Sequence, residues 1–358
     1  MHKRSLLIIL LIVVIFTSCT SFLSASPNNK VSKFVTADKS EADITQKDNI
    51  AKFHFIDVGQ GDCILIQGKD TNLLIDARTT QSGSIIYKYL KNLGIDYLDY
   101  FIGTHPHEDH LGGAALVLSS IDVGKVFVNP DTSTSYFYEK FLNTLIQKNI
   151  TPVLPDTDCI YEIGPFRLKF LSPTKDFGNA NDNSLVLTVQ FGDIRALFTG
   201  DAERAVEAEL IKTNFNISAD ILKVGHHGSR YASSAEFLNA VYPDVSVIQC
   251  GEENSYGHPH EEALQRLESI GSALLRTDKE GSIVLVTDGK TIQKEDGETY
   301  ENSGETPSLK LMYIGNIKSK VFHTEECPNL PVEKNRTVFY SREDAISLGY
   351  KECRNCNP

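Results

Sequence analysis

Residues 104–113 of this 358-residue chain read Thr-His-Pro-His-Glu-Asp-His-Leu-Gly-Gly and directly follow a short apolar segment. Imidazole and carboxylate groups are the ligands that suit zinc and similar divalent ions. His105 and His107 lie two residues apart, so their side chains point the same way in an extended loop. Asp109 and His110 are then available to a second ion. We therefore predict a binuclear metal centre at this segment.

Two later candidate ligands also follow predicted strands, because Asp201 comes after the predicted strand 195–199 and His226 after the predicted strand 220–224. A carboxylate such as that of Asp201 can bridge two ions about 3.5–4 Å apart, and His226 would complete the second ion. Metal binding lowers the pKa of water to about 7, so a centre of this kind provides a nucleophile at neutral pH.

The reaction also needs groups that handle protons and charge. We expect Asp109 to be a catalytic residue as well as a metal ligand. We expect His227 or His258 to donate a proton to the leaving group or to hold an oxyanion. Asp76 ends another apolar run, and we expect it to accept a hydrogen bond that orients a ligand loop.

The pattern His-x-His-x-Asp-His at 105–110 resembles the signature of the metallo-β-lactamase superfamily. Residues 55–66 resemble the opening of the ComEC-like metallo-hydrolase domain, and residues 74–76 resemble the first motif of the superfamily. The later motifs of the superfamily have counterparts in the same order along this chain. The residues that resemble them are 183–186, 199–201, 223–229 and 256–260. The resemblance spans residues 52–289 and implies an α/β (α+β) fold, an αββα sandwich with the site at the sheet edges.

One position departs from that resemblance. Many members of the superfamily carry a ligand histidine on the strand before the bridging aspartate, whereas residues 179–184 here contain none. The first ion then has an open position, takes Asp182 as a ligand, or is a harder ion such as Mn²⁺. The two ions of the centre are thus Zn or Mn, and the choice between His226 and His227 as ligand stays open.

A second set of candidate ligands lies near the C-terminus. His323 and Cys327 form one close pair and Cys353 and Cys356 another, with a loop between them. Two such pairs fit a closed tetrahedral zinc site. The segment 310–358 is small for a self-sufficient core, so one structural Zn would supply folding energy. Disulfides are the alternative.

The same segment resembles the metal-binding module of the Ada DNA-repair family, through residues 313–316, 320–323, 339–341 and 349–356. That family uses four cysteines, and His323 stands in place of the first, the thiolate that accepts a methyl group. The resemblance therefore implies a structural or DNA-contacting module and not repair chemistry. The segment is locally basic, which permits contact with nucleic acid.

The N-terminus has the character of a targeting signal. Basic residues precede the apolar run 6–16, which is too short to span a membrane. Small residues then precede Cys19, as in a lipoprotein cleavage box. We predict a signal peptide at 1–18, lipidation of Cys19 and anchoring to the extracytoplasmic face of the cell membrane, followed by a polar tether over 19–50. The alternatives are a plain secretory signal, giving a secreted protein, or a short uncleaved anchor.

The remaining chain divides by composition. We predict a hydrolase domain at 51–289, an acidic linker at 290–309 and the zinc module at 310–358. Hydrophobic residues make up 41% of the chain, enough for a sizeable core. The formal charge of −12 disfavours nucleic-acid binding through a uniformly basic face.

We expect an extracytoplasmic metallo-hydrolase that cleaves phosphodiesters, with DNA as the leading substrate and partner. One alternative is a phosphodiesterase for small or cell-surface substrates such as phosphorylcholine esters. Others are a lactamase or another acyl hydrolase, and a non-catalytic DNA-binding lipoprotein.

Overall fold

The structure is a computed structural model, and it describes residues 50–213, 215–300, 313–324, 327–339 and 342–358. The predicted signal peptide, Cys19, nearly all of the tether and the second half of the predicted linker lie outside the described residues. Within the described ranges, no helix combines the length and the apolar character that crossing a membrane requires.

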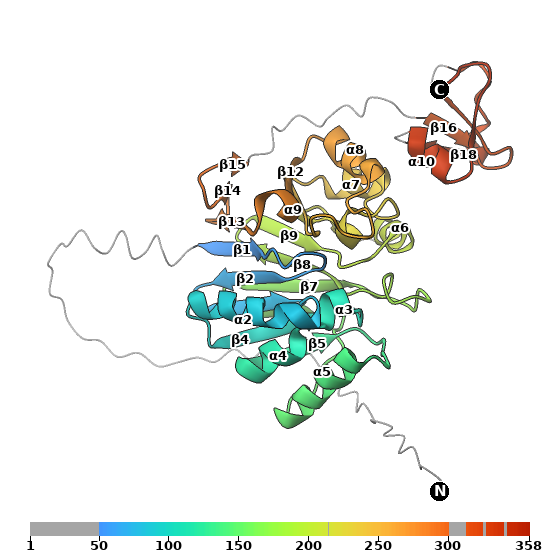
Figure 1. The fold of residues 1–358 in the computed structure, drawn as a ribbon. Coiled ribbons are helices and arrows are strands. Elements are labelled where there is room, and N and C mark those ends of the chain that lie inside the picture. Colours follow the sequence, from blue (N-terminus) through green and yellow to red (C-terminus); the bar gives the residue numbers. More distant parts are fainter. Residues whose placement is uncertain (1–49, 214, 301–312, 325–326, 340–341) are drawn as a thin grey trace, which may run out of the picture.

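Two β-sheets pack face to face, with helices on both outer faces (Figure 1). The first sheet has the order β15-β14-β13-β1-β2-β3-β4-β5 and the second β12-β11-β10-β9-β8-β7-β6. Strands of the first sheet are β1 (Ala51–Phe55), β2 (Ile64–Gly68), β3 (Thr71–Ile75), β4 (Tyr97–Gly103), β5 (Asp122–Val128), β13 (Ile283–Thr287), β14 (Ile292–Lys294) and β15 (Thr299–Tyr300). Those of the second are β6 (Ile160–Ile163), β7 (Phe166–Ser172), β8 (Val186–Phe191), β9 (Ile194–Phe198), β10 (Ile221–Lys223), β11 (Val245–Ile248) and β12 (Ala273–Arg276).

Helices form the two outer layers. The first sheet is covered by α2 (Gly83–Asn92), α4 (Ala114–Ser120) and α5 (Tyr136–Gln147), and the second by α6 (Arg204–Lys212), α7 (Ala235–Val241) and α8 (Glu261–Ser269). The short helices are η1 (Thr80–Ser82), α3 (Glu108–Leu111), η2 (Gly225–Gly228) and α9 (Thr277–Glu280). This arrangement confirms the predicted αββα sandwich.

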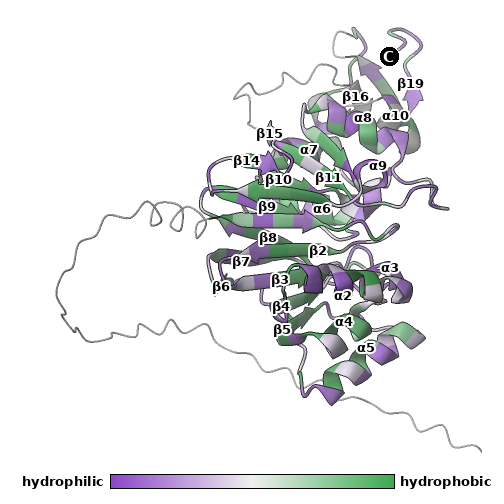
Figure 2. Ribbon diagram, turned by 60° about the vertical axis from the view of Figure 1, so that its left-hand side comes forward, coloured by the Kyte–Doolittle hydropathy of each residue, from purple (hydrophilic) through white to green (hydrophobic). Residues whose placement is uncertain are grey.

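The alternation of apolar side chains along each strand explains the layers. In β3, Leu73 and Ile75 belong to the core between the sheets, whereas Leu74 belongs to the core under α2 and α4. Phe53 and Phe55 of β1 pack against Phe198 of β9, and this contact joins the two sheets. Each fully buried side chain of this size contributes roughly 1.5–3 kcal/mol. Hydrophobic residues accordingly run along the strands of both sheets (Figure 2).

Strand direction decides where functional residues gather. The strands β9, β10, β11 and β12 pair in parallel, as do β3, β4 and β5. The carboxyl ends of parallel strands meet at one edge of a sheet, and ligands bind in the loops that follow them. Segments that follow these ends are therefore brought together from distant parts of the sequence.

Two expectations about organisation need correction. The predicted linker at 290–309 is wrong in its first half, because β14 and β15 extend the first sheet beyond β13. Ile292 and Tyr300 are buried in the inter-sheet core there, although the surrounding sequence is polar. Sequence reasoning also missed α5, whose buried Tyr138, Phe141 and Leu145 follow helical spacing.

The C-terminal segment forms a separate sheet with the order β18-β16-β17-β19. Its elements are β16 (Tyr313–Asn316), β17 (Val321–Thr324), η3 (Glu333–Asn335), β18 (Arg336–Phe339), α10 (Arg342–Ser347) and β19 (Lys351–Glu352). The apolar core of this module comprises Tyr313, Phe322, Phe339, Ala345 and Tyr350. A core this small contributes little stability on its own.

Candidate metal centre

The histidine-rich segment is fixed where it leaves β4. Backbone hydrogen bonds join Asp62 N to Asp109 O at 3.1 Å and Ala77 N to His110 O at 2.7 Å. The turn that carries Asp109 and His110 is therefore held by the loops after β1 and β3. The backbone positions from which these side chains extend are therefore fixed.

Four side chains from three loops converge on one point. The ligand atoms of Asp109, His110, Asp201 and His227 all lie within 4.8 Å of one another. His110 Nε2 and His227 Nε2 lie 3.2 Å and 3.5 Å from the same atom, Asp201 Oδ1. His227 Nε2 is also 3.5 Å from Asp109 Oδ2.

These facing atoms lack ordinary partners. Among the described residues, His110 Nε2, His227 Nε2 and Asp201 Oδ1 are buried and make no hydrogen bond. Buried polar atoms without partners are costly, and such atoms call for an ion or water between them. Two imidazoles and two carboxylates are a donor set that zinc and manganese accept. The residues present therefore fit a divalent cation.

The second oxygen of Asp201 faces a different group. Asp201 Oδ2 lies 3.8 Å from His105 Nε2 and 3.6 Å from His226 Nε2. His105 Nε2 is in turn 3.0 Å from His107 Nδ1. The two oxygens of one carboxylate thus face two sets of imidazole nitrogens, which is the arrangement of a carboxylate that bridges two ions.

Adjacent histidines consequently face different sides of Asp201. His227 lies in the set with Asp109 and His110, whereas His226 faces the same oxygen of Asp201 as His105 does. His226 can therefore supply an imidazole on the side where the sequence lacks the histidine expected before Asp201. Asp182, the alternative considered for that position, instead accepts hydrogen bonds from Glu203 N at 3.0 Å and Asn179 Nδ2 at 2.9 Å.

The backbone explains how neighbours diverge. His226 and His227 have φ values of 45° and 54°, in the left-handed region that non-glycine residues rarely occupy. Each such residue costs of order 1–3 kcal/mol and persists where surrounding contacts enforce it. The strained turn of η2 directs the two imidazoles to separate sides.

In three of the histidines, the ring nitrogen Nδ1, on the side away from Asp201, lies within hydrogen-bond distance of an oxygen. His110 Nδ1 lies 2.7 Å from Asp76 Oδ2, and His226 Nδ1 lies 2.7 Å from Glu203 Oε1. His227 Nδ1 lies 2.9 Å from the Gln249 backbone oxygen. The Gln249 backbone oxygen can only accept, so Nδ1 of His227 carries the proton. The carboxylates of Asp76 and Glu203 accept in the same way when they are ionised, which leaves each Nε2 for a metal.

Asp76 has the surroundings expected for an orienting group. Its carboxylate is fully buried and accepts hydrogen bonds from Thr104 N at 2.8 Å and Thr104 Oγ1 at 2.6 Å, besides its contact with His110. Sequence reasoning did not single out Glu203, although it lies two residues after Asp201. The partner Gln249 acts through its backbone and leaves no signal in the sequence.

A buried ion pair beneath the centre was also missed. Lys223 Nζ contacts Asp62 Oδ2, and Asp62 Oδ1 is 3.2 Å from His227 Nδ1. Both side chains are almost fully buried. Burial opposes ionisation of Asp62, but Lys223 and His227 outweigh it and lower the pKa of Asp62. A buried charge needs a partner of this kind, so Lys223 offsets part of the negative charge around the ligands.

The carboxylates also act on the imidazoles. Burial opposes protonation of His227, but Asp201 and Asp62 outweigh it and raise its pKa to about 9. At His110, Asp201 and Asp76 outweigh burial and raise the pKa well above the usual value. Without a cation these nitrogens hold protons, so a metal must displace protons when it binds.

His258 lies beside the centre and outside both ligand sets. Its ring centroid is 5.4 Å from that of His226 and 6.2 Å from that of His227. Burial, together with the nearby His227 and His226, lowers the pKa of His258 to about 3. A neutral imidazole at this position can donate its N–H to an oxyanion. With His227 among the ligand atoms, His258 is the better candidate for that role.

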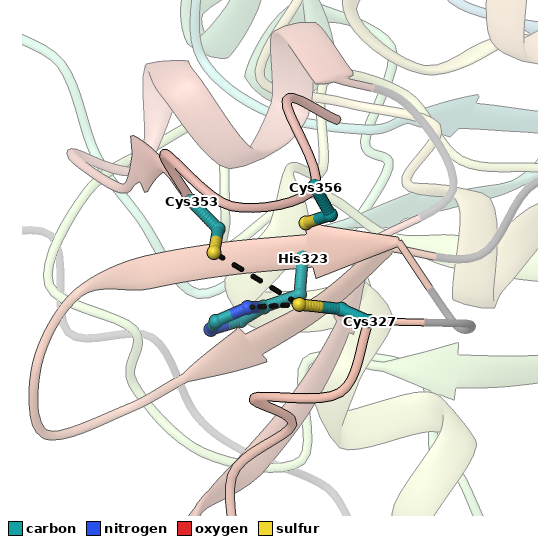
Figure 3. A group of neighbouring side chains, drawn as sticks. All are labelled: His323, Cys327, Cys353 and Cys356. Carbon is teal, nitrogen blue, oxygen red and sulfur yellow. Dashed lines mark hydrogen bonds between the residues drawn. The ribbon is translucent and has the colours of Figure 1, made fainter.

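The C-terminal module holds the other predicted ligands together (Figure 3). His323, Cys327, Cys353 and Cys356 present ligand atoms within 4.8 Å of one another. His323 Nδ1 is 3.2 Å from Cys327 Sγ, which is 3.9 Å from Cys353 Sγ. The cysteines of the described ranges are free thiols, so this cluster is not a disulfide.

Backbone groups support the sulfur atoms. Asn355 N donates to Cys353 Sγ and Thr324 N donates to Cys356 Sγ, both at 3.4 Å. Burial opposes ionisation of Cys353, but backbone N–H donors from Asn355 and Cys356 outweigh it and lower the thiol pKa. A Cys353 thiolate stabilised in this way suits a closed tetrahedral zinc site, whereas burial raises the pKa of Cys327 to about 11.

Comparison with known proteins defines the class. Residues 56–252 match the family model of the Metallo-beta-lactamase superfamily. The chain belongs to this superfamily, and its fold is the metallo-hydrolase fold found there.

Curated sequence relatives indicate which branch of the superfamily this chain resembles. The ComE operon protein 3 of Bacillus subtilis is 31% identical over 247 residues, which cover 64% of this chain and 32% of the relative. The Competence protein ComA of Neisseria gonorrhoeae is 32% identical over 231 residues, which cover 63% and 31%. The chain thus spans about a third of the length of these relatives. Among solved structures, the metallo-beta-lactamase fold protein YhfI from Bacillus subtilis has a TM-score of 0.48 and 14% identity, covering 66% of this chain and 100% of YhfI.

These relatives confirm the ComEC-like resemblance. The signal peptide and the Ada-like character of the C-terminal module stay predictions.

Proposed function

We propose that the chain is a metal-dependent phosphodiesterase that acts on DNA. The observation that carries the proposal is the position of Asp201, whose two oxygens face two separate sets of imidazole nitrogens. Two divalent ions held there would activate water at neutral pH and absorb charge on a phosphoryl oxygen.

The residues have distinct parts in this proposal. Asp109, His110 and His227 would hold one ion, and His105, His107 and His226 would hold the other. Asp201 would serve both ions. Asp76 and Glu203 fix the tautomer and orientation of His110 and His226. The neutral imidazole of His258 donates a hydrogen bond to the phosphoryl oxygen or the leaving group.

DNA is the proposed substrate for two reasons. The curated relatives carry the names of competence proteins, and a third is named Recombination protein 2, from Haemophilus influenzae. The C-terminal module is locally basic and holds a ligand set for one structural zinc ion. The net charge of −12 favours instead a small or cell-surface phosphodiester, which is the second candidate.

The experiment uses the purified full chain in detergent, with Mn²⁺ or Zn²⁺ added. It is incubated with linear DNA and with bis-p-nitrophenyl phosphate, and metals per chain are counted by elemental analysis. We expect about three metals and cleavage of both substrates. Cleavage of the ester alone would favour the small-substrate enzyme, and cleavage of neither would contradict the proposal.

We further propose that the protein is anchored through a lipid on Cys19 at the extracytoplasmic face of the membrane. The small residues before Cys19 and the short apolar run 6–16 support this. Membrane fractionation of Cys19→Ser tests it, because retention of that variant in the membrane would contradict lipidation.

A further inference from the structure

The loop between β11 and α8 is held in one shape by Asn254. Its Nδ2 donates to the backbone oxygens of Gly251, at 2.8 Å, and His258. Its Oδ1 accepts from Tyr256 N at 3.2 Å and His258 N at 3.0 Å. One amide thus fixes both ends of the segment that carries Tyr256 and His258, so their rings are presented in a defined orientation.

Tyr256 forms the outer surface of this segment. Its ring is nearly parallel to that of His258, with an interplanar angle of 20° and a centroid separation of 5.8 Å. His258 lies next to His226 and His227. Tyr256 nevertheless is 63% exposed, so core packing does not account for an aromatic residue here. A row of neighbouring rings thus runs from His226 and His227 through His258 to Tyr256, the exposed outer member.

An exposed ring beside a reacting phosphate suits a planar group attached to that phosphate. Stacking of a nucleobase on an aromatic side chain contributes about 1–3 kcal/mol, and it tolerates any base because every base has a π-face. A paired base inside a duplex has both faces covered, whereas an unpaired base can stack on protein. An exposed aromatic ring can therefore favour a nucleobase without selecting its sequence.

We infer that Tyr256 is the stacking platform for an unpaired nucleobase next to the scissile phosphate, so that the centre acts on single-stranded nucleic acid. This inference rests on the proposed phosphodiesterase function for its location, and it adds the substrate class. Tyr256 is a specificity residue in this scheme, and His258 remains the group beside the reacting atoms.

The test compares two esters with the same leaving group. Thymidine 5′-p-nitrophenyl phosphate carries a base, and methyl p-nitrophenyl phosphate does not. Tyr256→Ala, Tyr256→Phe and Tyr97→Ala are made in the full chain and assayed with both. Tyr97 is the matched control, because it is 50% exposed and lies at the start of β4, away from the end that leads to His105.

We expect Tyr256→Ala to lower the ratio of kcat/KM for the thymidine ester over the methyl ester about tenfold, the size of one stacking contact. Tyr256→Phe keeps the aromatic face and should keep the ratio. Tyr97→Ala should match the wild type. An unchanged ratio in Tyr256→Ala, including an equal fall with both esters, overturns the inference.

A binding measurement tests the stacking platform independently of the proposed phosphodiesterase activity. Affinity for oligothymidylate is measured by fluorescence anisotropy with the same variants. If the wild type cleaves neither ester but Tyr256→Ala weakens binding about tenfold while Tyr97→Ala does not, the proposed function fails and the platform stands. If Tyr256→Ala binds oligothymidylate as the wild type does, the platform is wrong whatever the enzyme cleaves.

Discussion

The two ligand clusters of this protein differ in the size of the apolar core that surrounds them. The His/Asp centre lies at the edges of two sheets that share an extensive apolar core, and Asp76, Glu203 and Gln249 hold its histidines from behind. The His/Cys cluster lies in a module whose apolar core, among the residues that the structure describes, is small. The first cluster is positioned by the fold before a metal binds, whereas we expect the second to need a bound metal to hold its fold together.

Metal removal should produce the largest difference in stability between the C-terminal module and the sandwich. Structural zinc in small modules supplies an apparent 10–16 kcal/mol of folding free energy, and the small apolar core cannot replace it. After chelation of the full chain, we expect hydrogen exchange to show loss of protection in β16 and β17, while β1 to β4 stay protected. Retained protection in β16 and β17 would contradict the zinc assignment, and loss in both regions would remove the contrast.

Asp201→Asn should have the largest effect on catalysis. The amide removes the charge that both sets of imidazoles face, and we expect hydrolysis of bis-p-nitrophenyl phosphate to fall by roughly 10³-fold. The thermal transition should stay near that of the wild type, because Asp201 is supported by the core. Asp193→Asn is the control, since Asp193 is exposed in the turn between β8 and β9. Near-normal turnover in Asp201→Asn would rule out the bridging role.

Asp76→Asn should have an intermediate effect. The amide retains a hydrogen-bond acceptor for Thr104 but weakens the hold on the Nδ1 proton of His110. Removal of such a supporting carboxylate costs about 10–100-fold in metal affinity. Titration with Mn²⁺ or Zn²⁺ should show the loss at the sandwich centre, whereas metal binding by the C-terminal module should not change. Equal affinity in the variant and the wild type would show that the support is unnecessary.

Metal affinity at the sandwich centre should also depend on pH. The pKa of His227 is raised to about 9 in the metal-free centre, so below that pH a metal must displace its proton. Affinity should therefore rise about tenfold per pH unit for each proton displaced as the pH approaches 9, and level off above it. Calorimetry in two buffers of different ionisation enthalpy measures the protons released. An affinity that does not change between pH 6.5 and 9 would show that His227 is not a ligand.

Much of the sandwich could be predicted from the sequence, because strands carry local signals. Alternating apolar residues marked β1 to β3, and polar clusters marked most turns. The sequence did not predict that β14 and β15 extend the first sheet. These short strands have polar surroundings and gain their stability only from pairing, β14 with β13 and β15 with β14. Strand propensity is weak where tertiary contacts decide the outcome.

The ligand types of both clusters were likewise determined by the sequence. Histidine, aspartate and cysteine bind metals through their own chemistry, and close spacing along the chain limits how far apart they can lie. The motif at 105–110 and the pairs at 323–327 and 353–356 therefore predicted metal sites before any fold was known.

Only the tertiary structure decided which residue faces which position. His226 and His227 are neighbours in the sequence, and a strained left-handed turn directs their imidazoles to different oxygens of Asp201. Asp62 and Lys223 are separated by most of the domain, yet they meet beneath the same centre. Spacing along the chain limits distance but does not fix direction, and direction is set by backbone torsion and by packing from the opposite sheet.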